Sequence, residues 1–252
     1  MADASFKDYF SSGSAGYAAY RPTYPRDLVD ELAKISPGLQ RALDCGCGTG
    51  QLSVLLAERF EEVIATDASA AQIAKAQPRE GVTYRTALAE DSGLPDASVD
   101  LITVAQAAHW LDLEKFYTEV RRVARPQAAI ALITYGVLHV EGPVDDALRH
   151  FYDVTIGPYW PPERRHVEDG YRNLPFPFKE VALPPLAIDV EWGLDDLIGY
   201  LGTWSAVKAA EKASGSNPVE ALAATLRKEW GDPDSRRRVT WPLSIRAGQI
   251  QK

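Results

Sequence analysis

The chain has 252 residues, of which 46% are hydrophobic and 25% charged, a composition typical of a soluble globular protein rather than a disordered or fibrous one. Its formal net charge of −8 at pH 7 would repel the phosphates of nucleic acids and anionic membrane surfaces. We find no apolar run long enough to span a membrane and no secretory leader pattern. We therefore expect a cytoplasmic protein that binds neither nucleic acid nor membrane.

Short apolar runs alternate with amphipathic segments between residues 40 and 136, a pattern that predicts βαβ units and a parallel sheet. Strands are expected at residues 41–45, 62–67, 82–88, 99–106 and 128–136. Helices are expected at residues 26–34, 51–60, 69–77 and 112–125, the third with Ser69 as its N-cap. The clustered Arg121, Arg122 and Arg125 then fall at a helix C-terminus, where cations are common.

The composition of the sequence changes after Gly136, and proline and aromatic residues are frequent at positions 156–166 and 173–178. We expect a loop-rich cap there. Regular elements return as a broken strand, two helices and a last strand, expected at residues 179–192, 194–213, 218–230 and 236–245. Arg236 to Arg238 would then mark a solvated strand edge.

A glycine loop, LDCGCGTGQ (residues 43–51), joins the first strand to the helix that follows it. Its Gly-x-Gly-x-Gly spacing differs from the dinucleotide fingerprint, and the P-loop lysine is absent. A tight glycine turn lets a ligand touch the backbone, and Asp44 just ahead of it suits a cationic amine or sulfonium. Both cysteines of the chain lie here, so no further cysteine is available for a metal site, and none is expected.

This loop resembles the first motif of class I S-adenosylmethionine-dependent methyltransferases with the methyltransferase type 11 core. The resemblance implies a doubly wound α/β fold: a seven-stranded, mostly parallel, Rossmann-like sheet whose last strand is antiparallel, with a helical and loop cap over the active site. It also implies one domain over residues 1–252, made of a lid (1–35), a cofactor-binding core (36–136), a cap with late elements (137–235) and a last strand (236–252).

The resemblance also assigns cofactor contacts. The methionine and ribose parts of S-adenosylmethionine would lie against the glycine loop, the ribose hydroxyls against the acidic residue that ends the second strand, and the adenine against the segment ALAEDSGLPD. Leu88 stands where that segment often has an aspartate. The implied cofactor residues are Asp44, Gly46, Cys47, Gly48, Gly50, Asp67, Ala68, Ala89, Glu90, Ala105 and Gln106.

Three distant segments, YAAYRPTYP (17–25), QAAHW (106–110) and YLGTWSAVKAAEKASGSNP (200–218), resemble small-molecule methyltransferases of the yeast trans-aconitate type. The N-terminal region of the chain is expected to form an aromatic lid that covers the sulfonium by cation–π contact. Its members are Phe6, Phe10, Tyr17, Tyr20 and Tyr24. Tyr20 and Arg21 are assigned to the cofactor site. Arg21 either holds a carboxylate, of cofactor or acceptor, or only packs at the start of the following helix.

His109 and Trp110, after the fourth strand, are the predicted catalytic residues. His109 would orient the methyl acceptor or remove its proton; the other histidines, His139, His150 and His166, fall in the cap. Possible pocket walls are Trp110, Tyr135, Tyr159, Trp160 and Trp204.

We predict a methyltransferase that acts on a carboxyl or hydroxyl oxygen of a small molecule, yields S-adenosylhomocysteine and is a monomer or homodimer. A carboxylate would need no base, whereas a hydroxyl would benefit from one. The alternatives are a nitrogen or carbon acceptor, a sensor that binds S-adenosylmethionine without turnover, and a nicotinamide-dependent oxidoreductase.

Overall fold

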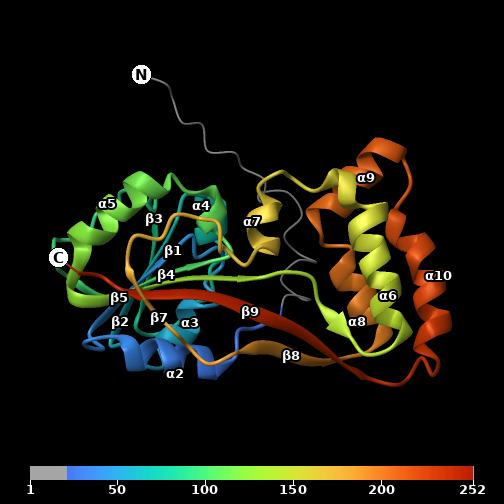
Figure 1. Cartoon of the computed structure of the whole chain (residues 1–252), viewed down its shortest axis with the longest axis horizontal. Helices are drawn as coiled ribbons and strands as arrows, with labels where there is room; N and C mark the ends of the chain where they lie inside the picture. The colour runs from blue at the N-terminus through green and yellow to red at the C-terminus, as the bar shows by residue number, and fades with distance from the viewer. Residues whose placement is uncertain (1–21, 252) are drawn as a thin grey trace.

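The computed structural model describes residues 22–251 and shows a mixed α/β fold built on one twisted sheet (Figure 1). Five parallel strands follow the order β3-β2-β1-β4-β5, as expected for a doubly wound sheet. They are β1 (Arg41–Cys45), β2 (Glu62–Asp67), β3 (Val82–Thr86), β4 (Val99–Ala105) and β5 (Ala124–Tyr135). All five were predicted from hydrophobic pattern alone.

The last strand, β9 (Arg237–Gln249), runs antiparallel to β5, which confirms the expectation for the end of the sheet. β9 has 13 residues and is longer than the segment that pairs with β5, so its remaining residues extend into the cap. There it pairs with β6 (His139–Val140) and β8 (Ala187–Trp192), while its far end pairs with β7 (Lys179–Val181). Within the described residues the sheet therefore has nine strands rather than the seven expected.

Both faces of the parallel sheet are buried at β1, β2, β4 and β5, whereas the edge strand β3 is largely exposed. Alternate residues of β5 point to opposite sides: Ala129, Ala131 and Ile133 pack in one hydrophobic cluster, and Ile130 and Leu132 in the other. Helices α2 (Arg26–Ile35) and α3 (Ser53–Leu56) cover the first face, and α5 (Leu113–Val123) covers the second. This two-sided burial explains why the strands are continuous apolar runs rather than alternating ones.

Helix boundaries in the core follow their caps. Ser69 accepts a hydrogen bond from the Gln72 N–H and begins α4 (Ala70–Ile73), as expected. Asp112 begins α5 by accepting a hydrogen bond from the Lys115 N–H. Both α3 and α4 are single turns, shorter than the ten and nine residues predicted.

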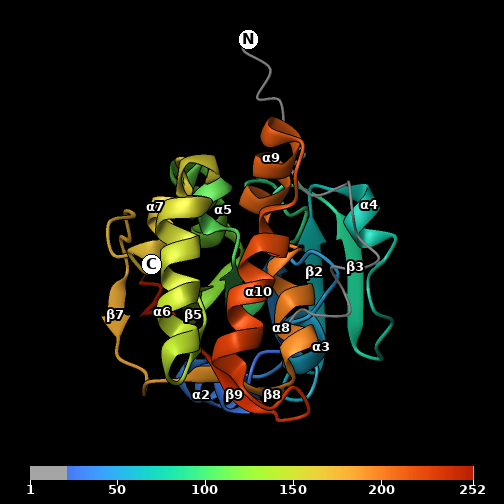
Figure 2. The same ribbon diagram turned by 90° about the vertical axis from the view of Figure 1, so that its right-hand side faces the viewer.

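The cap is more helical than expected. It contains α6 (Pro143–His150), α7 (Arg164–Glu168), α8 (Leu194–Leu201), α9 (Ser205–Ser214) and α10 (Pro218–Trp230), with the short turns η2 (Phe151–Thr155) and η3 (Gly157–Tyr159). Figure 2 shows α6, α8 and α10 side by side at one end of the molecule. The loop-rich expectation was wrong for residues 143–150, where Pro143 opens a helix that buries Val144 and Leu148.

The single helix expected over residues 194–213 is broken into α8 and α9. Trp204, at the break, has an extended backbone and turns its ring onto Tyr152, with ring centroids 5.6 Å apart in an edge-to-face arrangement. Gly202 caps the end of α8, and packing of the Trp204 ring holds the chain out of helical geometry at the break. One hydrophobic cluster runs without interruption from the sheet through to the buried Trp230 and Trp241 of the cap side.

Candidate cofactor and acceptor site

A cavity of about 540 Å³ opens at the carboxyl ends of β1, β2 and β4, where parallel α/β sheets bind ligands. Most of the predicted site residues line it: Asp44, Gly46, Cys47, Gly48, Asp67, Ala68, Ala89, Glu90, Ala105, Gln106, His109 and Trp110. Gly50 is not among the lining residues. Tyr20 and Arg21 lie outside the described residues, as do Phe6, Phe10 and Tyr17 of the expected lid; Tyr24, its last aromatic, is described and lines the cavity.

The glycine loop is shaped by positions that reject a side chain. Gly46 has φ +66°, and a Cβ there would lie 2.6 Å from the Cβ of Ala107. Gly50 has φ +88°, and its Cβ would overlap the phenol ring of Tyr84. Gly46 therefore lets the loop approach the end of β4, whereas Gly50 lets β3 support the loop from behind, which accounts for its place outside the lining.

Asp44 is buried in the loop's floor, with 1% of its surface exposed. Its Oδ2 accepts a hydrogen bond from Ser53 Oγ (2.6 Å) and its Oδ1 one from Thr103 Oγ1 (2.7 Å). Burial raises the pKa of this carboxyl to about 6, although both hydrogen bonds act to lower it. Both donors are neutral hydroxyls, and no ion pair within residues 22–251 includes Asp44. The site thus fits a cationic ligand group.

Asp67 ends β2 and ties the loop to it. Its Oδ2 accepts a hydrogen bond from the Gly48 N–H and its Oδ1 one from the Ser69 N–H, both at 2.8 Å. Asp67 also lines the cavity, and each of its oxygens can accept a further hydrogen bond, as a carboxylate that binds two vicinal hydroxyls must.

The predicted adenine segment contacts the start of α5. Glu90 Oε1 accepts a hydrogen bond from the backbone N–H of Asp112 (2.9 Å), while Ala89 is buried and Leu88 is 53% exposed. These three residues form one rim of the cavity with Lys115.

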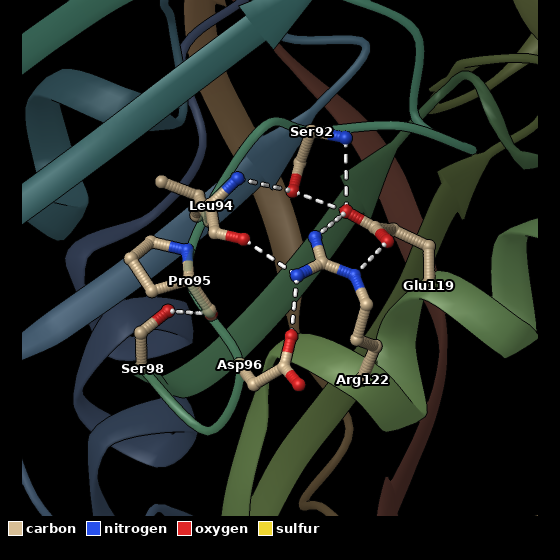
Figure 3. Close-up of polar contacts among 7 residues, drawn as sticks. All are labelled: Ser92, Leu94, Pro95, Asp96, Ser98, Glu119 and Arg122. Atoms are coloured by element: carbon tan, nitrogen blue, oxygen red, sulfur yellow. Dashed lines mark hydrogen bonds and ion pairs between the residues drawn. The ribbon is translucent and has the colours of Figure 1, made fainter.

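An ion pair between the buried Glu119 and the partly exposed Arg122 holds the loop that follows this rim (Figure 3). Glu119 Oε1 accepts hydrogen bonds from the N–H and hydroxyl of Ser92, and both Glu119 oxygens accept from Arg122. Arg122 also donates to the carbonyl of Leu94 and to Asp96, both at 2.7 Å. Burial acts to raise the pKa of Glu119, but the Arg122 and Ser92 bonds hold it below its ordinary value. This network fixes the rim against α5.

The end of β4 is strained. Gln106 has φ +58°, a region that non-glycine residues rarely occupy. Both ends of its amide bond to β5: Nε2 donates to the carbonyl of Tyr135 (2.9 Å), and Oε1 accepts from Thr134 Oγ1 (2.8 Å). These bonds turn the chain abruptly into η1 (Ala108–Trp110), which places His109 and Trp110 at the cavity.

His109 is held by a residue that the sequence did not identify. Its Nδ1 lies 2.8 Å from the hydroxyl of Tyr171, which follows α7. Burial, and then the nearby positive charge of Arg164, lower the pKa of His109 to about 3, so the imidazole is neutral at pH 7. Tyr171 is fully buried, its pKa is raised by burial, and its φ of +61° is strained. Its only signal in the sequence is the preceding Gly170, itself at φ +60°.

The expected aromatic walls divide into two groups. Trp110 lines the cavity, together with Tyr24. Tyr135, Tyr159, Trp160 and Trp204 do not; Tyr135 packs edge-to-face on Tyr24, and Tyr159 is 37% exposed. Trp160 and Trp204 belong to a cluster in the cap with Tyr152, with centroid separations of 5.1 to 5.8 Å.

The two cysteines stay as thiols. Burial, and then the charge of Asp44, raise the pKa of Cys45 and of Cys47 well above the usual range. In the part of the chain that the structure describes, no cluster of histidine, cysteine or acidic side chains could hold a metal ion. No helix there is long and apolar enough to cross a membrane.

Comparison with known proteins places this geometry in context. Residues 43–132, from β1 through most of β5, match a family described as a methyltransferase domain. A Dictyostelium discoideum protein named as a methyltransferase is 34% identical over 233 residues, covering 91% of this chain and 89% of that protein. A Saccharomyces cerevisiae protein named as an S-adenosylmethionine-dependent methyltransferase is 34% identical over 131 residues, 48% of this chain and 45% of that protein.

A solved structure from Anaeromyxobacter dehalogenans, described as a type II methyltransferase, shares 52% sequence identity with a TM-score of 0.88. The match covers 92% of this chain and 98% of that chain, so the similarity includes the cap as well as the cofactor-binding core.

Proposed function

Because this chain belongs to the S-adenosylmethionine-dependent methyltransferases, we propose that it methylates an oxygen of a small molecule, and that the oxygen is that of a carboxylate. The observation that carries the proposal is His109, a neutral imidazole at the cavity whose Nδ1 contacts the Tyr171 hydroxyl.

The protonation state of His109 supports a carboxylate acceptor over a hydroxyl acceptor. General-base catalysis is most effective when the pKa of the base lies near the working pH, and the pKa of His109 is about 3. Such a group accepts a proton from a hydroxyl poorly. A carboxylate is already ionised at pH 7 and has no proton to lose. His109 then serves to orient the acceptor by a hydrogen bond.

The other residues that line the cavity would bind the cofactor and exclude water. When bound, S-adenosylmethionine supplies a methyl carbon whose bond to the sulfonium breaks as the acceptor oxygen attacks, the electron pair remaining on the sulfur of S-adenosylhomocysteine. Asp44 would hold the ammonium of the cofactor, Asp67 its ribose hydroxyls, and Ala89 and Glu90 its adenine. Trp110 and Tyr24 would exclude water from the reacting atoms, and alignment of the two reactants supplies the rest of the rate.

An assay with tritiated S-adenosylmethionine tests the proposal. The purified chain is incubated with panels of small carboxylic acids, phenols, alcohols and amines, and the products are then treated with mild alkali. We expect label that alkali releases as methanol, because methyl esters hydrolyse whereas ethers and methylamines do not. Label that resists alkali would contradict a carboxylate acceptor. Tight S-adenosylmethionine binding with no product from any panel would favour a sensor.

A His109→Ala variant tests the role of the imidazole in the same assay. We expect kcat to fall while the affinity for S-adenosylhomocysteine stays the same, because the orienting hydrogen bond is lost. Full turnover in this variant would remove His109 from the mechanism.

We also propose that the protein acts in the cytoplasm, does not bind nucleic acid, and works as a monomer or homodimer. The net charge of −8 supports the second point, since it opposes contact with a phosphate backbone.

A further inference from the structure

Acidic side chains outnumber basic ones along the cavity. Among the described residues that line it are five carboxylates and one ammonium: Asp44, Asp67, Glu90, Asp112, Glu163 and Lys115. The first four carboxylates belong to the core, and each accepts hydrogen bonds from the chain around it. Lys115 is paired with Asp112 at 2.7 Å, on the rim assigned to the adenine. Glu163 is the lining carboxylate that comes from the cap.

Glu163 differs from the other four in having no such partner. It is half-buried and directly precedes α7, a position from which an acidic side chain often caps a helix, but its side chain makes no capping hydrogen bond. Within residues 22–251 its carboxylate has neither a hydrogen bond nor an ion pair. The carboxylate is therefore available to a ligand in the cavity.

The backbone around Glu163 places it at the acceptor end. Pro161 and Pro162, whose rings fix φ, come just before it, and their carbonyls accept hydrogen bonds from the first turn of α7. Helix α7 packs against η1, which carries His109, and Tyr171 beyond α7 contacts the His109 imidazole. Glu163 thus lines the cavity from the same cap segment that holds His109.

The neighbouring arginine does not neutralise this carboxylate. Arg164 lies against two aromatic rings, its guanidinium carbon 4.8 Å from the ring centroid of Trp160, and its Nε donates to the Tyr152 hydroxyl at 2.8 Å. Arg164 is not among the residues that line the cavity, and no ion pair within the described part of the chain joins it to Glu163. A carboxylate in this state attracts a cation and repels a second carboxylate.

We propose that Glu163 binds a protonated amine of the methyl acceptor, so that the acceptor carries both the carboxylate that is methylated and an ammonium group. The proposal rests on the proposed function for the identity of the methylated atom. An ammonium has no lone pair with which to attack the methyl carbon, so the bond forms to the carboxylate oxygen and the amine keeps its protons. Glu163 is then a specificity-determining residue that selects amino acids over monoacids and diacids of the same length.

Direct binding tests the role of Glu163 without any turnover. Isothermal calorimetry at pH 7.5 on the full chain, saturated with S-adenosylhomocysteine, would compare three probes with the same four-methylene chain: 5-aminopentanoate, adipamate and adipate. Their far ends are an ammonium, a neutral amide and a carboxylate. We expect affinity to fall in that order, because Glu163 attracts the first and repels the last. Failure of 5-aminopentanoate to bind, or no preference for it over adipamate, would overturn the proposal.

Variants of Glu163 then locate the preference. We expect Glu163→Gln to weaken 5-aminopentanoate about tenfold and to leave adipamate unchanged. Glu163→Lys should reverse the order, so that adipate binds most tightly, a result that a merely structural role would not produce. An unchanged order of affinities in Glu163→Gln would overturn the proposal.

Glu168→Gln is the matched control, because Glu168 is an exposed carboxylate on the same helix and is not among the lining residues. It should keep the wild-type order of the three probes. The affinity for S-adenosylhomocysteine, measured for each variant, shows whether the fold and the cofactor site are intact.

Methyl transfer distinguishes failure of this proposal from failure of the proposed function. If Glu163→Gln raises KM for amino acids and leaves KM for monoacids unchanged, Glu163 selects the ammonium, as proposed. If the wild type binds 5-aminopentanoate through Glu163 but methylates no carboxylate, the ammonium site stands and the proposed acceptor oxygen is wrong. If all carboxylates are methylated with equal KM in the wild type and Glu163→Gln, the proposed function stands and the role of Glu163 is wrong.

Discussion

The cofactor-binding core and the cap place functional groups by different means. In the core, each site residue follows a strand end, and the glycine loop, Asp67 and Gln106 reach the cavity because β1, β2 and β4 end at the same edge. In the cap, Tyr171 reaches His109 from the segment that follows the short helix α7, and no repeated pattern in the sequence marks its place.

The core and the cap should therefore respond differently to amino-acid substitutions. The core positions ligand groups through backbone geometry, such as the positive φ of Gly46, where an added methyl group has no space. The cap positions them through side-chain contacts that can be exchanged one at a time. We therefore expect substitutions in the core to act on cofactor binding as a whole, and substitutions in the cap to act on the acceptor.

The largest effect is expected for Gly46→Ala. The new Cβ would lie 2.6 Å from the Cβ of Ala107, and the residue would have to keep φ near +66°, so the loop must move from the cavity. We expect affinity for S-adenosylhomocysteine to fall more than ~100-fold by calorimetry, since several cofactor contacts shift together. Gly215→Ala is the control, because Gly215 has φ +76° in the cap with open space around it. Equal cofactor affinity in the two variants would contradict a steric role for Gly46.

A smaller but pH-dependent effect is expected at Asp44. Its pKa is raised by burial from 3.8 to about 6, so the proton stabilises the folded, unliganded protein fully below pH 3.8, and this contribution is lost as the pH rises through 6. Binding of the cofactor ammonium requires the ionised form. Affinity for S-adenosylhomocysteine should therefore fall ~tenfold for each pH unit below 6.

Asp44→Asn supplies the comparison for that pH profile. The amide keeps the size of the side chain but removes the charge, so we expect about 30-fold weaker binding at pH 7.5, equal to about 2 kcal/mol, and no change between pH 5 and 7. A wild-type profile that is also flat over this range would show that Asp44 does not titrate in the binding step.

The same contrast explains how much could be predicted from the sequence. The five parallel strands were predicted because their hydrophobic patterns are local signals. The cavity-lining residues from Asp44 to Trp110 were assigned mainly through the family resemblance, whose motifs stand at strand ends and in the glycine loop. Tyr171 was missed because its contact with His109 joins residues 62 positions apart. The break before Trp204 was missed although Gly202 caps α8, because the contact that fixes the turned-out ring is with Tyr152, which lies on another segment. Gly50 was assigned to the cofactor because spacing alone does not tell which side of a loop faces the ligand.

Tyr171→Phe should act on turnover and not on the cofactor. The substitution keeps the buried ring and removes the hydroxyl that lies 2.8 Å from His109 Nδ1. Loss of one hydrogen bond of about 1 kcal/mol should lower kcat about fivefold by freeing the imidazole to rotate. S-adenosylhomocysteine affinity is the control and should not change. A fall in that affinity, with kcat unchanged, would place Tyr171 in the cofactor site instead.

The smallest effect is expected for the double variant Cys45→Ala, Cys47→Ala, and it separates the two residue types of the glycine loop. Cys45 is fully buried, so truncation should lower the free energy of unfolding by about 1 kcal/mol. Cys47 lines the cavity, but burial raises the pKa of its thiol, which therefore stays uncharged. Within residues 22–251, the hydrogen bond found for its Sγ is to the Gly48 carbonyl, at 3.6 Å. Affinity for S-adenosylhomocysteine should stay within ~threefold of wild type, because a thiol in van der Waals contact contributes well under ~1 kcal/mol to binding. A larger loss, in a variant whose thermal unfolding remains cooperative, would mean that the loop binds its ligand through sulfur as well as through the backbone that its glycines expose.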